Sequence, residues 1–159
     1  MDKHLFKYLD KLGIKYKIHE HPAVFTVEEA DKIKEETPHI LHTKNLFLKD
    51  ENNNFYLVSI YAYKRLDLKL LKEKLNAKKK LSFATAEQLK EHLNLTPGSV
   101  SIFGMIYAKS VALIVDKQVW DAEIVGFHPN INTSTLELTH QGLEKFYNSL
   151  KLKKHILQL

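Results

Sequence analysis

TKNLFLKDENNNFYLVSIY, residues 43–61, predicts a β-hairpin at the centre of the fold. Its two halves are rich in aliphatic and aromatic residues, and DENNN (50–54) between them is a run of turn-forming residues. At a side-chain period of two, Lys44 shares one strand face with Leu46 and Leu48. Because desolvating an ammonium group is costly, such a lysine either reaches water at the strand end or faces a pocket that uses its charge.

The rest of the chain alternates helical and strand patterns around this hairpin. Helices are expected at 5–12, 26–36, 85–93 and 143–150, and further strands at 14–18, 111–115, 124–129 and 133–138. Several strand pairs are joined too closely for a crossover helix between them. We therefore expect an α+β (mixed α/β) fold with a central mixed, largely antiparallel sheet flanked by helices.

Composition indicates a single domain and excludes the functional classes that need cysteine. The 159 residues are 44% hydrophobic and 10% aromatic, which suits one core, so residues 1–159 are expected to form a single domain. The chain has no long apolar run and a charged start, MDKHLFKYLD, so we expect a cytoplasmic protein with no membrane partner. The absence of cysteine excludes disulfides, thiolate catalysis and cysteine-ligated metal centres.

Common catalytic signatures are missing from the chain. It contains no G-x-S-x-G, P-loop, H-E-x-x-H or dinucleotide glycine motif. The histidine pairs His19/His21 and His39/His42 do not have the spacing of a known metal site, so we expect no metal and no cofactor. His128, in GFHPN, follows a predicted strand and precedes a proline, where the backbone is restrained and a side chain can be aimed.

Positive charge is concentrated in one segment, KRLDLKLLKEKLNAKKK (64–80). It holds eight basic and two acidic residues, a balance of +6, in a chain whose net charge is +5. The segment is either a solvated surface or a phosphate-binding one, because contacts between lysine or arginine and phosphates drive nucleic-acid binding. The candidate nucleic-acid-binding residues are Lys64, Arg65, Lys78, Lys79 and Lys80.

Five motifs occur in a fixed order along the chain: TKNLFLKD, KRLDLKLL, LSFATAEQL, LTPGSVSIFG and GFHPNINTSTLEL. In this order they resemble the YbaK and prolyl-tRNA synthetase-associated editing-domain family over essentially the whole chain. The resemblance implies aminoacyl-tRNA deacylation, which is hydrolysis of the ester between a wrong amino acid and a tRNA. KNLFLKD, LTPGSV and FHPN are most similar to the free-standing proteins that clear alanine from proline tRNA.

The resemblance also implies roles for individual residues. Lys44 matches the residue most associated with activity, and Asn45 and His128 match residues that help to hold the substrate. Gly98 and Ser99 lie in the loop whose backbone contacts the substrate. The implied partners are tRNA, through the acceptor end of proline tRNA, and a prolyl-tRNA synthetase or elongation factor. No side chain is implied as the nucleophile, because water attacks with help from a ribose hydroxyl of the tRNA.

Three departures from the family pattern bear on substrate choice. Ile102 stands where the family has a proline, Tyr107-Ala108-Lys109 replaces an acidic or amide residue, and Tyr61-Ala62-Tyr63 replaces a small Pro-Gly step. A deacylase of another small or cysteine-like acyl-tRNA is therefore the nearest alternative. A non-catalytic tRNA-binding or synthetase-binding module is the competing class, and a small-molecule esterase would leave the basic segment unexplained.

Overall fold

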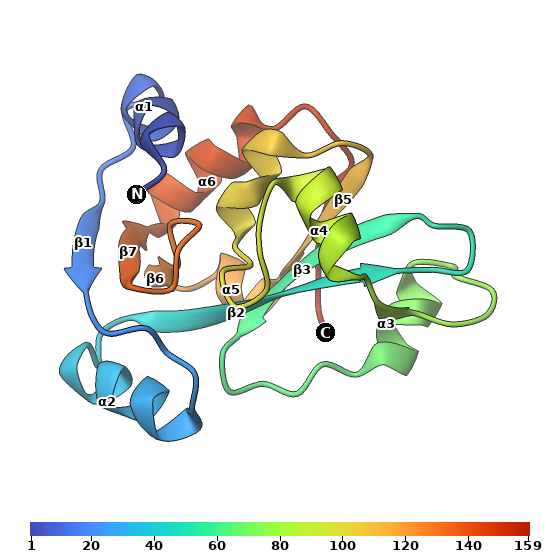
Figure 1. Ribbon diagram of the computed structural model, residues 1–159, viewed down its shortest axis with the longest axis horizontal. Coiled ribbons are helices and arrows are strands. Elements are labelled where there is room, and N and C mark those ends of the chain that lie inside the picture. The colour runs from blue at the N-terminus through green and yellow to red at the C-terminus, as the bar shows by residue number, and fades with distance from the viewer.

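The computed structural model describes residues 1–159, and its elements surround the predicted hairpin (Figure 1). The strands are β1 (Lys17–Glu20), β2 (Leu41–Lys49), β3 (Phe55–Tyr61), β4 (Ser82–Phe83), β5 (Val111–Asp116), β6 (Ile124–Phe127), β7 (Ser134–Thr139) and β8 (Lys154–Leu157). The helices are α1 (Lys3–Lys11), α2 (Val27–Glu36), α3 (Leu68–Lys74), α4 (Ala86–Leu93), α5 (Lys117–Trp120) and α6 (His140–Ser149), with a 3₁₀ helix, η1, at Ile102–Tyr107. None of the helices is long and apolar enough to cross a membrane.

The strands form one sheet in the order β1-β7-β6-β2-β3-β5-β8, with β4 paired to β2. Four neighbouring pairs are antiparallel and three are parallel, so the expected mixed sheet is confirmed. The predicted hairpin is β2–β3, in which Lys44 pairs with Ile60 and Asn45 with Ser59. Solved structures of the same fold, described below, confirm the fold class.

Apolar residues on the two faces of the sheet build separate cores. Helices α1, α4 and α6, with η1, cover one face and contribute to a cluster of 24 buried residues that includes Phe47. On the other face α3 packs over a cluster of six that includes Leu48. The alternation expected for the first half of the hairpin is therefore confirmed, because Phe47 and Leu48 enter different cores.

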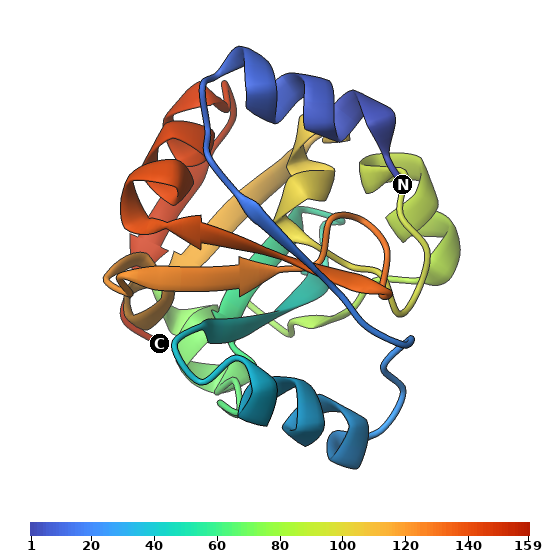
Figure 2. The same ribbon diagram turned by 90° about the vertical axis from the view of Figure 1, so that its left-hand side faces the viewer.

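Helix α2 differs from the other helices of this length, since it buries no residue completely. It lies on the opposite side of β1, β6 and β7 from α1 and α6 (Figure 2). Thr26 caps it by accepting from the Glu29 backbone N–H, as the sequence predicted. The space between this loosely packed helix and the sheet contains the candidate site.

One expected strand has other bounds in the structure, and the last strand was not predicted. The strand expected at 14–18 forms at Lys17–Glu20, because Ile14 turns into the main core and β1 pairs with β7 only from Lys17 onward. The last strand, β8, was missed, because its short sequence KHIL has no alternating apolar pattern and pairs only after the fold presents the β5 edge.

Candidate functional site

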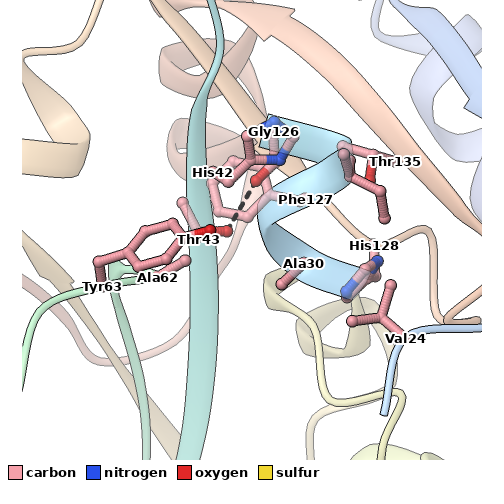
Figure 3. A pocket seen from close by; sticks show the side chains of 11 residues that line it. Val24, Ala30, His42, Thr43, Ala62, Tyr63, Gly126, Phe127, His128 and Thr135 are labelled. Carbon is pink, nitrogen blue, oxygen red and sulfur yellow. Dashed lines mark hydrogen bonds between the residues drawn. The ribbon is translucent and has the colours of Figure 1, made fainter. Parts of the chain in front are cut away.

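A small pocket opens where strands β2 and β6 separate. The two strands pair in parallel only at Leu41 with Val125 and at His42 with Gly126. Beyond this register β6 ends at Phe127, while β2 continues as far as Lys49. The pocket has a volume of about 80 Å³, enough for several water molecules or a small acyl group. It is lined by Val24, Ala30, Ile33, His42, Thr43, Ala62, Tyr63, Gly126, Phe127, His128 and Thr135 (Figure 3).

Gly126 allows the strands to approach closely at the floor of this pocket. A Cβ atom built at Gly126 would lie 2.7 Å from Ile40 Cγ2 and 3.0 Å from Thr135 Cγ2. Thr43 donates a hydrogen bond of 2.8 Å to the Gly126 carbonyl oxygen, drawn in Figure 3, and ties the start of β2 to β6. Any larger residue at position 126 would therefore push the walls apart.

His42 is neutral, and its tautomer is fixed by its partner. Its Nε2 atom lies 2.7 Å from Thr37 Oγ1, and the Thr37 hydroxyl donates to the Ile33 carbonyl oxygen at 2.6 Å. Because a hydroxyl has one proton, the ring must donate from Nε2, which leaves Nδ1 as an acceptor. Burial, with the nearby imidazoles of His128 and His21, lowers the pKa of His42 to about 4.

His128 is oriented in a similar way at the end of β6. Its Nδ1 atom lies 3.0 Å from the Ser134 carbonyl oxygen, which can only accept, so Nδ1 donates. Burial holds the pKa of His128 below its ordinary value, so the ring is neutral at neutral pH and its Nε2 atom is an acceptor. His128 and His42 both line the pocket, each with a lone pair available for a ligand.

Helix α2 roofs the pocket through polar contacts as well as Ala30 and Ile33. The Tyr63 hydroxyl donates to Asp31 Oδ1 at 2.7 Å, and Lys34 Nζ lies 4.2 Å from the centre of the Tyr63 ring. Burial and this hydrogen bond raise the pKa of Tyr63 to about 12. Tyr63 is one of the departures from the family pattern. Through these contacts it links helix α2 to the segment that follows β3.

Lys44 follows the pocket residues His42 and Thr43 directly along β2. By strand alternation it shares a face with His42, and it is half-buried. The structure records no hydrogen bond or ion pair for its ammonium group, in contrast to Lys64, whose Nζ atom lies 2.8 Å from the buried Asp116 carboxylate. A half-buried lysine without a protein partner beside a pocket is available to an anionic group of a ligand.

Asn45 lies on the opposite face of β2, and its side chain is buried. Its Oδ1 atom has no hydrogen-bond partner, and the same is true of the hydroxyl of Ser59, its neighbour across the hairpin. A buried acceptor left unpaired costs about 1–3 kcal/mol, so a donor from water or a ligand would be stabilising here.

Gly98 and Ser99 lie in a loop next to the segment that follows β6. Gly98 has a φ of +88°, a conformation that glycine adopts easily, and a Cβ atom built there would lie 4.0 Å from Asn132 Nδ2. Ser101, from the same loop, donates to the His128 carbonyl oxygen. The loop is thereby held against the histidine segment, although neither Gly98 nor Ser99 lines the pocket itself.

The structure places Ile102 outside the pocket and His42 inside it, which was not predicted from the sequence. Ile102 is fully buried in the main core at the start of η1, so it does not reach the pocket and can influence it only through neighbouring residues. His42 was considered in the sequence only as a metal ligand. Its place two residues before Lys44 on the same strand face is the signal that identifies it as a pocket residue.

The predicted phosphate-binding lysines lie at the other end of the hairpin. Lys78, Lys79 and Lys80 are exposed, and the backbone N–H groups of Lys78 and Lys79 donate to Glu51 in the β2–β3 turn. Arg65 is exposed on the segment that leaves β3 at the pocket end. The positive segment is thus divided between both ends of the hairpin.

Comparison with known proteins shows similarity over most of the chain. The family model of the aminoacyl-tRNA editing domain matches residues 21–146. The prolyl-tRNA editing protein ProX of Acetoanaerobium sticklandii is 39% identical over 140 residues, which cover 86% of this chain and 84% of that protein. The prolyl-tRNA synthetase associated domain-containing protein 1 of Xenopus laevis is 34% identical over 152 residues, with 89% and 87% covered.

The fold has a counterpart among solved structures as well. A crystal structure of a candidate trans-editing enzyme for prolyl-tRNA synthetase superposes with a TM-score of 0.74 at 18% identity, over 100% of this chain and 98% of that one. At this identity the structural match supports the fold alone. The sequence matches, which cover most of the chain, show that it belongs to the aminoacyl-tRNA editing domain family.

Proposed function

We propose that residues 1–159 form a trans-acting editing domain that hydrolyses the ester of mischarged proline tRNA, with alanine as the preferred acyl group. The observation that carries this proposal is the small pocket between α2 and the separating strands β2 and β6, with Lys44 next to it in a chain of the editing-domain family. ProX, named as a prolyl-tRNA editing protein, supports proline tRNA as the substrate.

The reaction requires water to attack the ester carbonyl carbon. The bond from that carbon to the ribose oxygen breaks, and the products are a free amino acid and a tRNA with its ribose hydroxyl restored. A negative charge develops on the carbonyl oxygen during attack, and the Lys44 ammonium group can stabilise it or bind the terminal phosphate. A neighbouring ribose hydroxyl of the tRNA assists the water, so no protein nucleophile is needed.

The neutral groups around the pocket hold the substrate. The Nε2 lone pair of His128 can accept a hydrogen bond from the α-ammonium group of the aminoacyl ester. Asn45 is not part of the pocket lining, but its unpaired Oδ1 can accept a donor from a substrate group or water on the other face of β2. The loop with Gly98 and Ser99 is attached to the His128 segment through Ser101, so it can approach the bound acyl group.

Pocket size gives a physical basis for selection. A synthetase site built for proline cannot strongly reject a smaller amino acid, because missing methylene groups are worth only about 1–3 kcal/mol. A second site that admits only small acyl groups removes this error. The volume of about 80 Å³ and the tight floor at Gly126 favour alanine over bulkier acyl groups.

The body of the tRNA would be bound by exposed basic residues outside the pocket. We assign this role to Arg65 and to Lys78, Lys79 and Lys80, with a prolyl-tRNA synthetase or elongation factor as the protein partner that delivers the tRNA. Lys64 was part of the same prediction, but its ion pair with Asp116 makes it the least available of the five.

Deacylation assays with a panel of aminoacyl-tRNAs test the proposal. We expect rapid loss of alanine from alanyl-tRNA for proline, slower loss of cysteine or other small groups, and little loss of proline from prolyl-tRNA. Faster hydrolysis of a cysteinyl ester than of an alanyl ester would assign the chain to the alternative substrate class. Equal rates for alanine and proline, or no hydrolysis of any ester, would contradict the proposal.

A further inference from the structure

Three side chains from separate elements meet on the sheet face that carries the pocket. His19 lies on β1, Glu137 on β7, and His39 in the turn between α2 and β2. The β1–β7 register pairs His19 with Thr135, which places it on the same face as Glu137. The three are far apart in the sequence, and neither their spacing nor a motif predicts that they meet.

Both imidazoles point at the same carboxylate oxygen. His19 Nε2 lies 2.9 Å and His39 Nε2 2.8 Å from Glu137 Oε1, and all three atoms lie within 4.8 Å of one another. Glu137 is 8% exposed, and although burial alone would raise its pKa, the hydrogen bonds from His39 and His19 keep that pKa below its ordinary value. The carboxylate is therefore ionised at neutral pH and is held in place by two potential ligands.

We propose that His19, His39 and Glu137 form a binding site for a divalent transition-metal ion of the zinc class. Two imidazole nitrogens and one carboxylate oxygen with an open fourth position are a typical ligand set for such ions. In a tetrahedral zinc site, ligand distances of about 2.0–2.2 Å place the donor atoms roughly 3.3 Å apart. The observed distances of 2.8 and 2.9 Å are therefore about half an ångström shorter than those that an ion requires.

The change from a hydrogen-bonded cluster to a metal site is small. Each ring would move its proton from Nε2 to Nδ1, where the structure records no protein partner for either histidine. His39 is 53% exposed and His19 30%, so their rings can shift and water can fill the fourth position. The Lys17 ammonium group approaches the other carboxylate oxygen, Oε2, at 3.9 Å, so it does not compete with the imidazoles at Oε1.

Such an ion would add a connection between the paired strands β1 and β7 and the turn before β2. It would join β1 and β7 to the turn that leads from α2, the roof of the pocket, into β2. Since α2 buries no residue completely, a bound ion would stabilise its position. This inference does not depend on the proposed deacylation, and its test measures binding alone.

Isothermal titration calorimetry of the chelator-treated full chain with Zn²⁺ tests the site, with Co²⁺ absorption as a report on coordination geometry. We expect one equivalent of Zn²⁺ to bind with micromolar or tighter affinity, and His39→Ala or His19→Ala to weaken binding at least tenfold. Zn²⁺ should also raise the thermal unfolding midpoint of the wild type but not that of His39→Ala. Mg²⁺ should not bind, because it prefers oxygen ligands.

The control is His155→Ala, which removes an exposed histidine from β8, outside the cluster. It should bind Zn²⁺ as the wild type does, whereas Lys17→Gln should bind it more tightly because a nearby positive charge is removed. Circular dichroism checks that each variant is folded. The proposal is overturned if the wild type binds no Zn²⁺, or if His39→Ala and His19→Ala bind it as tightly as the wild type.

Discussion

The two ends of strand β2 carry different chemistry. At its start, His42 and Thr43 line a small pocket with neutral histidines, and Lys44 follows them. At its end, roughly 20 Å away along the strand, Glu51 in the β2–β3 turn binds the loop that carries Lys78, Lys79 and Lys80. The start of β2 is enclosed by side chains from several helices and strands, whereas the lysines near its end are exposed to solvent.

This difference separates two kinds of lysine. Lys44 is half-buried next to a pocket, so its charge acts at short range on one group of a ligand. Lys78, Lys79 and Lys80 are exposed to water, where charges contribute through counterion release and are screened by salt. Variants at the two ends should therefore change different steps of the same reaction.

Loss of the pocket-end lysine should have the largest effect on the rate. We expect Lys44→Ala to lower the single-turnover rate of deacylation by roughly 10² or more, because a charge-stabilising donor is removed, and to weaken tRNA binding less. Lys49→Ala, at the other end and on the other face of the same strand, is the matched control and should react at nearly the wild-type rate. Normal deacylation by Lys44→Ala would mean that Lys44 has only a structural role.

Gly126→Ala tests the tight floor of the pocket and should have a smaller effect. The added methyl group would overlap Ile40 and Thr135, and we expect a loss of about 1–3 kcal/mol in the free energy of unfolding, measured by urea denaturation. The rate on alanyl-tRNA should fall less than in Lys44→Ala. Gly142→Ala in α6 is the control, because its Cβ would have no contact shorter than 3.4 Å and alanine favours helix, so stability should stay the same or rise slightly. Equal stability of both variants would show that the side chains around Gly126 can move to accommodate the added methyl group.

Neutralising the turn-end lysines should have the smallest effect on the rate and a clear effect on binding. With Lys78, Lys79 and Lys80 all changed to alanine, we expect weaker tRNA binding and a salt slope reduced by about 0.7–0.9 for each phosphate that is no longer neutralised. The rate at saturating tRNA should stay near that of the wild type. A variant with Lys3, Lys7 and Lys11 of α1 changed to alanine is the control, since these are equally exposed but lie outside the segment. An unchanged slope in the first variant would identify the segment as a solvated surface.

Local sequence patterns were enough to predict the hairpin and most of the elements around it. The alternation in 43–61 and the turn residues at 50–54 specify β2 and β3, and Thr26 and Thr85 cap the helices that follow them. Five ordered motifs were enough to indicate the family that the comparisons then showed. These features depend on residues close together in the chain, where propensity and side-chain period act directly.

Only the tertiary structure decided which polar residues meet. The pocket exists because β2 and β6 separate after His42 and Gly126, a parallel contact between segments about eighty residues apart. His19, His39 and Glu137 converge for the same kind of reason, since the β1–β7 register and the turn before β2 bring them together. The tautomer of His42 likewise follows from Thr37 and Ile33. Sequence patterns report on near neighbours and strand faces, whereas sheet order and register determine which side chains far apart in the chain share a site.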